Sequence, residues 1–211
     1  MQQLTSGNQK MSTPKTPAPD SGGRNFEPSL FSLLKPLRIW LCLSVLITLS
    51  ACSTTALQSE YAANQPTLSV REFFDGTLSA HGIIKNRSGL VTRYFNANVE
   101  ASWDANGVGT ISEYFTYDDG ENAERIWKLV PKAPNQYIAT ANDVVGESTI
   151  TVKGNSLFME YVLQLPRKDS TIEVNIDDRM YLVNNKVIIN EGVIRKFGIR
   201  IGSVTLSFTK E

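Results

Sequence analysis

The residues most able to do chemistry in this chain are charged side chains placed on apolar strand faces. Glu113 alternates with Ile111 and Phe115, and Arg125 alternates with Trp127. Because side chains two residues apart point to the same face of a strand, each charge shares its face with apolar neighbours. A carboxylate is almost never fully buried without a partner, so these charges need either water or each other.

Two further residues extend this pattern. Glu160 lies in line with Phe158 and Val162, and Arg93 offers a second cation near the start of its own strand. Two interpretations stay open: the charges face solvent on an amphipathic outer wall, or they line a cavity marked by a few polar groups. In the second interpretation the ligand-binding residues are Arg93, Glu113, Arg125, Trp127 and Glu160.

Acidic residues in predicted turns raise the question of a metal site. They are Asp118, Asp119, Asp143, Asp177 and Asp178. Carboxylate oxygens bind calcium, but the chain has no Asp-x-Asp-x-Asp-Gly loop with a distal Glu. Asp is also favoured in turns because its side chain caps its own backbone. We therefore predict no metal and no cofactor.

No motif for nucleophilic or metal-assisted catalysis is present. The single histidine, His81, lies between Ala80 and Gly82, and the chain has neither Gly-x-Ser-x-Gly nor His-Glu-x-x-His. No catalytic residue is predicted. Two carboxylates that meet only in the fold would still permit a hydrolase, which is the least favoured of the functional alternatives.

Strands are the elements that must position these residues. In residues 94–103, Phe95, Ala97, Val99, Ala101 and Trp103 share one face and polar residues take the other. Short runs of this kind recur to residue 208, separated by Gly, Asn, Asp and Pro. We expect an all-β, antiparallel meander of about 8 to 10 strands, closed into a barrel rather than folded into a sandwich. Separate strands are expected around residues 172–176 and 180–183, with Asp177 and Asp178 in the turn between them.

The N-terminal part has the features of an export signal. Lys35 and Arg38 precede an uncharged run over residues 39–49, which is shorter than the roughly 20 apolar residues of a membrane span. The run ends in Leu-Ser-Ala-Cys, which resembles a bacterial lipobox and implies cleavage before Cys52 with a diacylglycerol and an amide-linked acyl chain, such as palmitate, on that cysteine. Two or more acyl chains anchor a protein stably to a membrane.

These signals divide the chain into four parts. Residues 1–34 are rich in Pro, Ser, Thr and Gly, and we predict that they are disordered or an over-extended n-region. Residues 35–51 are predicted to be the lipoprotein signal peptide. We expect residues 52–67 to form a lipidated tether and residues 68–211 to form the β-barrel domain. With Cys42 removed and Cys52 acylated, the mature part holds no free thiol. The formal net charge is zero, so no basic footprint for nucleic acid is visible.

Several short motifs follow one another between residue 68 and the C-terminus. They include Phe73-Phe74-Asp75-Gly76, Asn86-Arg87-Ser88-Gly89, Tyr117-Asp118-Asp119-Gly120, Asn142-Asp143-Val144-Val145-Gly146 and Lys196-Phe197-Gly198. In these the chain resembles the Gram-negative lipoprotein family of domain of unknown function 3833. The resemblance implies a lipoprotein with a lipocalin-like or calycin-like barrel, and no established activity.

Three functions are compatible with these features. The favoured one is a membrane-anchored envelope lipoprotein whose barrel binds a small apolar or lipid-like ligand. The second is a structural or assembly lipoprotein that docks an envelope protein partner, and the third is the carboxylate hydrolase. Since Ser53 follows Cys52 where an inner-membrane retention signal more often has Asp, the predicted location is the periplasmic face of the outer membrane.

Overall fold

The computed structural model of the chain describes residues 58–167 and 170–211. The predicted disordered segment 1–34, the signal peptide 35–51 and the acylation site Cys52 lie outside the described residues. In the described part, no helix combines the length and apolar character needed to cross a bilayer.

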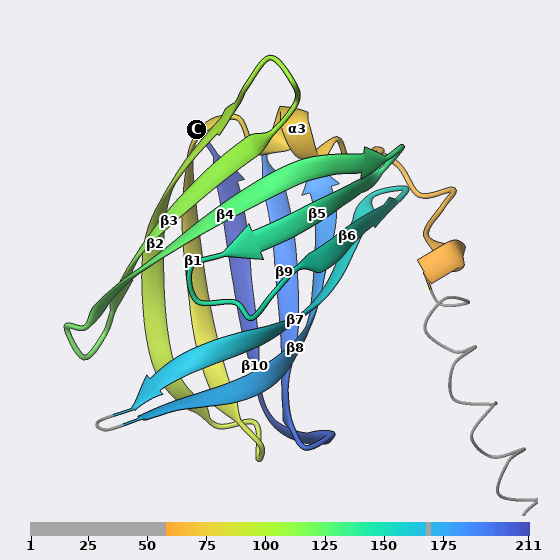
Figure 1. Cartoon of the computed structure of the whole chain (residues 1–211). Helices are drawn as coiled ribbons and strands as arrows, with labels where there is room; N and C mark the ends of the chain where they lie inside the picture. Colours follow the sequence, from red (N-terminus) through yellow and green to blue (C-terminus); the bar gives the residue numbers. More distant parts are fainter. Residues whose placement is uncertain (1–57, 168–169) are drawn as a thin grey trace, which may run out of the picture. The chain divides into compact units, whose positions relative to one another are not determined.

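Ten antiparallel strands form a closed barrel in which each strand pairs with its neighbours in sequence and β1 closes on β10 (Figure 1). The strands are β1 (Gly76–Asn86), β2 (Val91–Trp103), β3 (Gly109–Tyr117), β4 (Asn122–Ala133), β5 (Gln136–Ala141), β6 (Ser148–Lys153), β7 (Ser156–Arg167), β8 (Ser170–Asn184), β9 (Val187–Lys196) and β10 (Ile199–Lys210). The prediction of an all-β meander closed into a barrel is confirmed.

One detail of the predicted strands is wrong. Residues 170–184 form the single strand β8, so Asp177 and Asp178 lie in mid-strand and not in a turn. The unbroken ladder from Ser156↔Tyr181 to Arg167↔Ser170 against β7 holds both residues extended. As consecutive strand residues they point to opposite faces, Asp178 into the barrel and Asp177 out of it.

A short helix, α3 (Val70–Phe73), covers one end of the barrel. The Ser69 side chain accepts a hydrogen bond from the Glu72 backbone N–H and caps the helix at its start. Phe74, which follows the helix, packs edge-on against Phe208 of β10, with ring centroids 5.4 Å apart. This end of the barrel is therefore filled by apolar side chains.

The segment before the helix lies against the outside of the barrel. Tyr61 contacts Phe158 of β7 and Tyr181 of β8, with ring centroids 5.5 and 5.8 Å away. The Leu68 backbone N–H donates to the Gly154 carbonyl in the β6–β7 turn. The described end of the predicted tether is thus packed on the outer wall near β7 and β8.

The shortest ladder of the barrel wall lies between β6 and β7. Their ladder holds only the pairs Thr151↔Phe158, Val152↔Leu157 and Lys153↔Ser156, and the chain next pairs at the bridge Val144↔Leu163. Between these points the Ser148 hydroxyl donates to the Glu160 carbonyl at 2.9 Å. The Val145 backbone N–H also donates to the Val162 carbonyl, so the stretch without ladder pairs to β7 covers residues 146–150.

Candidate functional site

Glu113 and Arg125 are brought together inside the barrel by the register of two neighbouring strands. Glu113 of β3 lies directly opposite Arg125 of β4, and both belong to the inward-facing set that includes Ile111 and Trp127. Cross-strand partners on one face have Cβ atoms about 5 Å apart, which suits an acid–base pair. Both side chains therefore lie inside the barrel and not on its outer wall.

Arg125 is held mainly by a third residue, Asp143, from the loop after β5. The Arg125 Nε lies 2.9 Å from each Asp143 carboxylate oxygen, and Nη2 lies 2.8 Å from Oδ2. This two-pronged geometry is the strongest form of the pair. The Glu113 Oε2 is farther away, 4.0 Å from the Arg125 Nη1. Arg125 is thus committed to Asp143, and Glu113 receives only a weaker attraction.

Glu113 is buried and one of its oxygens has no partner. The residue is 7% exposed, and no side chain or backbone group among the described residues hydrogen-bonds Oε2. Burial raises the pKa of Glu113 to about 7, and the attraction of Arg125 opposes that rise. A carboxyl group with such a pKa gains and loses its proton near neutral pH, which is common at functional sites.

Asp178 adds a second buried carboxyl to the same interior. It accepts a hydrogen bond of 2.5 Å from the Asn190 side chain of β9, and Asn190 also donates to the Arg179 carbonyl. Burial raises the pKa of Asp178 to about 6, although the Asn190 hydrogen bond acts against the rise. The negative charge of Asp178 raises the pKa of Glu113 further, because like charges repel in a poorly hydrated space.

Two aromatic rings lie beside these charged side chains. The Trp127 and Tyr161 rings meet edge to face, with centroids 5.3 Å apart and planes at 84°. Burial raises the pKa of Tyr161, and the nearby Asp178 raises it further. The phenol therefore stays protonated. We call Glu113, Arg125, Asp143, Tyr161, Asp178 and Asn190 the interior polar cluster.

A cavity of about 40 Å³ adjoins Glu113 on the side of α3. Its lining is Val70, Phe74, Ile111, Glu113, Trp127, Leu129, Ile150, Leu157, Met159, Met180 and Phe208. Among these residues Glu113 is the only one that ionises. The volume exceeds that of one water-sized probe but suits only a few non-hydrogen atoms. Met159 and Met180 have flexible, polarisable side chains, so this lining can adapt to a larger occupant.

Arg93, another predicted site residue, lies at the opposite end of the interior. Its Nη2 pairs with Asp119 at 2.8 Å and with Glu121 at 2.6 Å, and its guanidinium lies 3.6 Å from the Tyr117 ring centroid. Its Nε is buried without a partner among the described residues. The rings of Phe95, Phe115 and Tyr117 separate Arg93 from Arg125. Arg93 is therefore not part of the interior polar cluster.

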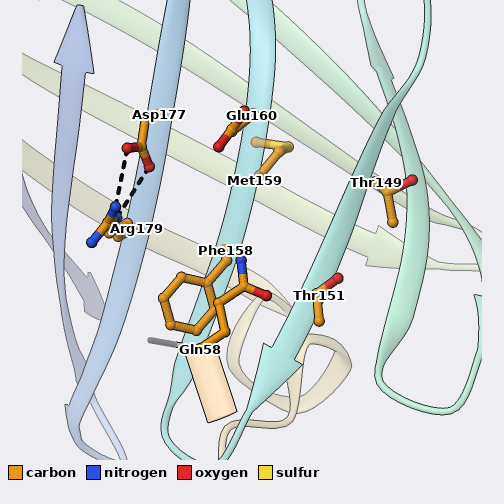
Figure 2. A pocket seen from close by; sticks show the side chains of 8 residues that line it. All are labelled: Gln58, Thr149, Thr151, Phe158, Met159, Glu160, Asp177 and Arg179. Atoms are coloured by element: carbon orange, nitrogen blue, oxygen red, sulfur yellow. Dashed lines mark hydrogen bonds and ion pairs between the residues drawn. The ribbon is translucent and has the colours of Figure 1, made fainter. Parts of the chain in front are cut away.

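Glu160, the fifth predicted site residue, points out of the barrel and is exposed. It lines an outer pocket of about 270 Å³ with Gln58, Thr149, Thr151, Phe158, Met159, Asp177 and Arg179 (Figure 2). Asp177 is paired there with Arg179 at 3.1 Å and Arg195 at 3.3 Å. The structure thus joins Glu113, Arg125 and Trp127, and leaves Glu160 on the outer wall.

Sequence reasoning missed Tyr161 and Asn190, and it assigned Asp143 and Asp178 to turn chemistry. A signal existed for Asp178, which alternates with Val174 and Ile176 on one face of a strand. His81 is exposed and its Nδ1 lies 2.7 Å from the Asn96 side-chain oxygen. Among the described side chains, no three His, Cys, Asp or Glu residues converge as a metal site requires.

The barrel is similar in fold to a solved structure. It is similar to the S-type phycobiliprotein lyase CPES from Guillardia theta, with a TM-score of 0.51 and 11% identity over 68% of this chain and 93% of that chain. A protein of unknown function of the DUF3598 family from Nostoc punctiforme aligns with a TM-score of 0.49 and 8% identity, over 71% of this chain and 51% of that chain. The chain thus spans about half the length of the second protein. The likeness to the lyase concerns the fold alone, which is lipocalin-like.

Sequence comparison extends this result to the family. No curated protein is similar enough in sequence to count as a relative. The profile of the family described as "Protein of unknown function (DUF3833)" matches residues 46–210, which include the whole barrel. This chain belongs to the DUF3833 family.

Proposed function

We propose that this protein is a lipid-anchored protein of the cell envelope whose barrel binds a small, largely apolar molecule through a hydrogen bond to Glu113. The observation that carries the proposal is that Glu113 lines an apolar cavity inside a closed barrel while its buried Oε2 has no hydrogen-bond partner among the described residues. An unsatisfied buried polar atom costs about 1 to 3 kcal/mol. A ligand that supplies the missing hydrogen bond recovers that free energy.

The chemistry of Glu113 points to a hydroxyl group on the ligand. With a pKa of about 7, the side chain is a hydrogen-bond donor below neutral pH and an acceptor above it. A hydroxyl group both donates and accepts, so it matches either state. A carboxylate ligand would instead place a third negative charge beside Glu113 and Asp178 in a buried space. An apolar alcohol is therefore the favoured class.

The open stretch between β6 and β7 supports a route to this cavity. Met159 lines both the inner cavity and the outer pocket, so its side chain separates the two spaces. Met159 lies in the stretch of β7 that has no ladder pairs to β6, between the pair Thr151↔Phe158 and the bridge Val144↔Leu163. A change of the Met159 rotamer would connect the cavity to the outside without opening the end covered by α3.

Binding is better supported than hydrolysis. Glu113 and Asp178 are two carboxyl groups with raised pKa values, as a hydrolase would need. Of the two, only Glu113 lines the cavity of about 40 Å³, and no second ionisable group among the lining residues could act with it on a bound sugar or peptide and an attacking water. Glu113 is instead placed to recognise one polar atom of an apolar molecule.

The ligand test is a calorimetric titration of the full chain purified from membranes, with pentan-1-ol as the probe and pentane for comparison, because the cavity suits only a few non-hydrogen atoms. We expect saturable binding of the alcohol. Glu113→Leu removes the hydrogen bond and should weaken alcohol binding by up to about tenfold, since a hydrogen bond contributes about 0.5 to 1.5 kcal/mol. Alkane binding should not weaken.

Glu160→Leu is the matched control, because Glu160 is a carboxylate of the same length on the outer wall. It should leave the affinity for the alcohol unchanged. In Glu113→Leu, Arg125 keeps its two-pronged pair with Asp143, so no buried charge loses its partner and we expect the fold to be retained. Equal alcohol affinity of the Glu113→Leu and unmodified chains, or absence of saturable binding, would contradict the ligand proposal.

The anchor and the location rest on residues 39–53. The basic flank, the apolar run and the Leu-Ser-Ala-Cys ending support cleavage and acylation at Cys52, and Ser53 supports the periplasmic face of the outer membrane. Intact mass spectrometry of the membrane-purified protein should give the chain from Cys52 with its acyl groups. Cys52→Ala should give an unprocessed or unanchored chain, and a normally acylated Cys52→Ala product would refute the assignment.

A further inference from the structure

Two neighbouring hairpins at the end of the barrel opposite α3 expose apolar and basic side chains together. We call residues 85–90 and 195–201 the basic rim. Its apolar members are among the most exposed of the described chain: Phe197 at 87%, Leu90 at 66% and Ile199 at 55%. The hairpins lie side by side because β1 pairs with β10 as far as Asn86↔Gly202 (Figure 1).

The charges of the rim all have one sign. It carries Lys85, Arg87, Arg195, Lys196 and Arg200, and neither segment contains Asp or Glu. Arg195 pairs with Asp177, whereas none of the other four forms an ion pair within the described residues. The β3–β4 hairpin of the same barrel end instead carries Asp118, Asp119 and Glu121. A chain with zero net charge thus concentrates positive charge on one sector.

The conformation of Phe197 shows that folding alone does not explain its presence. Phe197 and Gly198 have φ values of 51° and 76°, the two consecutive positive angles of a tight hairpin turn. Such turns favour Asn-Gly, and the β4–β5 turn indeed places Asn135 at φ 59°. A phenylalanine in this position is strained, and at 87% exposure it gains little packing in return.

We infer that the basic rim docks onto the anionic phospholipid surface of the membrane that holds the lipid anchor. This inference rests on the anchor in the proposed function. Lys and Arg near a membrane are attracted to anionic headgroups, while aromatic and aliphatic side chains enter the boundary between headgroups and acyl chains. The rim presents both kinds of side chain on two adjacent hairpin tips.

The length of the tether allows this orientation. Gln58, the first described residue, lines the outer pocket with Asp177 and Arg179. Asp177 pairs with Val193 of β9. The four residue steps along the strand from Val193 to Phe197 span about 13 Å. The six residue steps from Cys52 to Gln58 can span at most about 21 Å. An acylated Cys52 can therefore reach the level of Phe197, so that the anchor and the rim can occupy one membrane surface.

The test places a polarity-sensitive thiol probe at Phe197→Cys in the full acylated chain. Because Cys42 is removed with the signal and Cys52 is acylated, the new thiol is the one labelled. The protein is reconstituted into phosphatidylcholine vesicles with and without phosphatidylglycerol, both containing lipids that carry a quencher. We expect the probe to be quenched several-fold more strongly in the vesicles that contain phosphatidylglycerol than in those without it. The double substitution Arg87→Glu, Arg200→Glu should reduce the quenching in the anionic vesicles several-fold.

Val183→Cys is the matched control, because Val183 is an apolar residue of 57% exposure beside the β8–β9 turn at the other end of β9. Its probe should be quenched weakly in both vesicles, and Lys186→Glu should have no effect. Equal quenching at positions 183 and 197 would overturn the inference. Protection of position 197 by a co-purified protein, without lipid quenching, would also overturn it and favour a protein partner.

Failure of the anchor is recognised separately. The mass of each sample reports whether Cys52 is acylated. If it is not, sedimentation of the unanchored chain with phosphatidylglycerol vesicles tests the rim directly. Loss of sedimentation by roughly tenfold or more in the Arg87→Glu, Arg200→Glu chain supports the rim, and unchanged sedimentation refutes it.

Discussion

Two arginines point into the same barrel and meet acids there, yet their surroundings differ in hydration. The acids around Arg93, Asp119 and Glu121, have side chains that are each 55% exposed. The acids around Arg125 are more covered, with Asp143 at 27% and Glu113 at 9%. Water can complete the hydrogen bonding of the first group. In the second it cannot do so freely, which leaves Glu113 with a free oxygen and a raised pKa.

This difference explains why similar residues support different roles. An ion pair close to solvent contributes little free energy and tolerates substitution. A buried charge needs its partners, because hydration no longer compensates for their loss. The Arg93 group therefore forms hydrated ion pairs near the end of the barrel, whereas the Arg125 group lies beside the buried Glu113 of the proposed ligand site.

Arg125→Met should have the largest effect on stability. It leaves the Asp143 and Glu113 carboxyl groups without their shared cation, so the free energy of unfolding should fall by about 3 to 5 kcal/mol in urea titrations. Because Arg125 lowers the pKa of Glu113 more than any other neighbour does, that pKa should also rise further. Arg93→Met is the matched substitution and should cost about 1 kcal/mol or less. Equal losses would remove the contrast between the two groups.

Glu113→Gln should change how stability depends on pH. The pKa of Glu113 is about 7 in the folded chain against 4.5 for a free group, so the folded state binds this proton more tightly. The resulting stabilisation is complete below pH 4.5 and is lost as the pH rises through 7. The free energy of unfolding therefore falls by about 3 kcal/mol, because each unit of difference between the two pKa values corresponds to about 1.36 kcal/mol.

The glutamine side chain carries no charge at any pH. Between acidic and alkaline pH, the free energy of unfolding of the Glu113→Gln chain should therefore fall by about 3 kcal/mol less than that of the unmodified chain. Asp178, with a pKa of about 6, keeps its own contribution in both chains and acts in the same direction. Urea unfolding over a pH series measures the difference. Parallel curves for the two chains would show that Glu113 is hydrated and not buried.

Gly82→Ala tests the packing that separates the two groups. A Cβ at Gly82 would lie 2.3 Å from the Phe95 ring and 2.7 Å from the Leu206 Cβ, so the ring lies directly over the glycine. Overpacking of this kind should cost about 1 to 3 kcal/mol in thermal or urea unfolding. Gly192→Ala is the control, since its new Cβ would meet only contacts of 3.5 to 3.7 Å. A neutral Gly82→Ala would indicate that Phe95 can move and that the two groups are not isolated.

Much of the fold could be predicted because alternation is local. The period of two in β2, β3 and β4 shows which side chains share a face, and thus that Glu113 lies with Ile111 and Arg125 with Trp127. The alternation in residues 172–182 also runs through Asp178, although the acidic pair was assigned to a turn. Turn preference is a weak signal, and here the ladder with β7 overrides it.

The sequence by itself determined the strand periodicity, the family and the residues that share each strand face, because these depend only on neighbours along the chain. Only the tertiary structure decided which face is inside, since barrel closure and strand register set that choice. The same closure places Asp143 against Arg125, Asp178 near Glu113 and Glu160 on the outer wall. It also leaves Glu113 beside a cavity, because burial and unmet hydrogen bonds arise only when distant strands pack together.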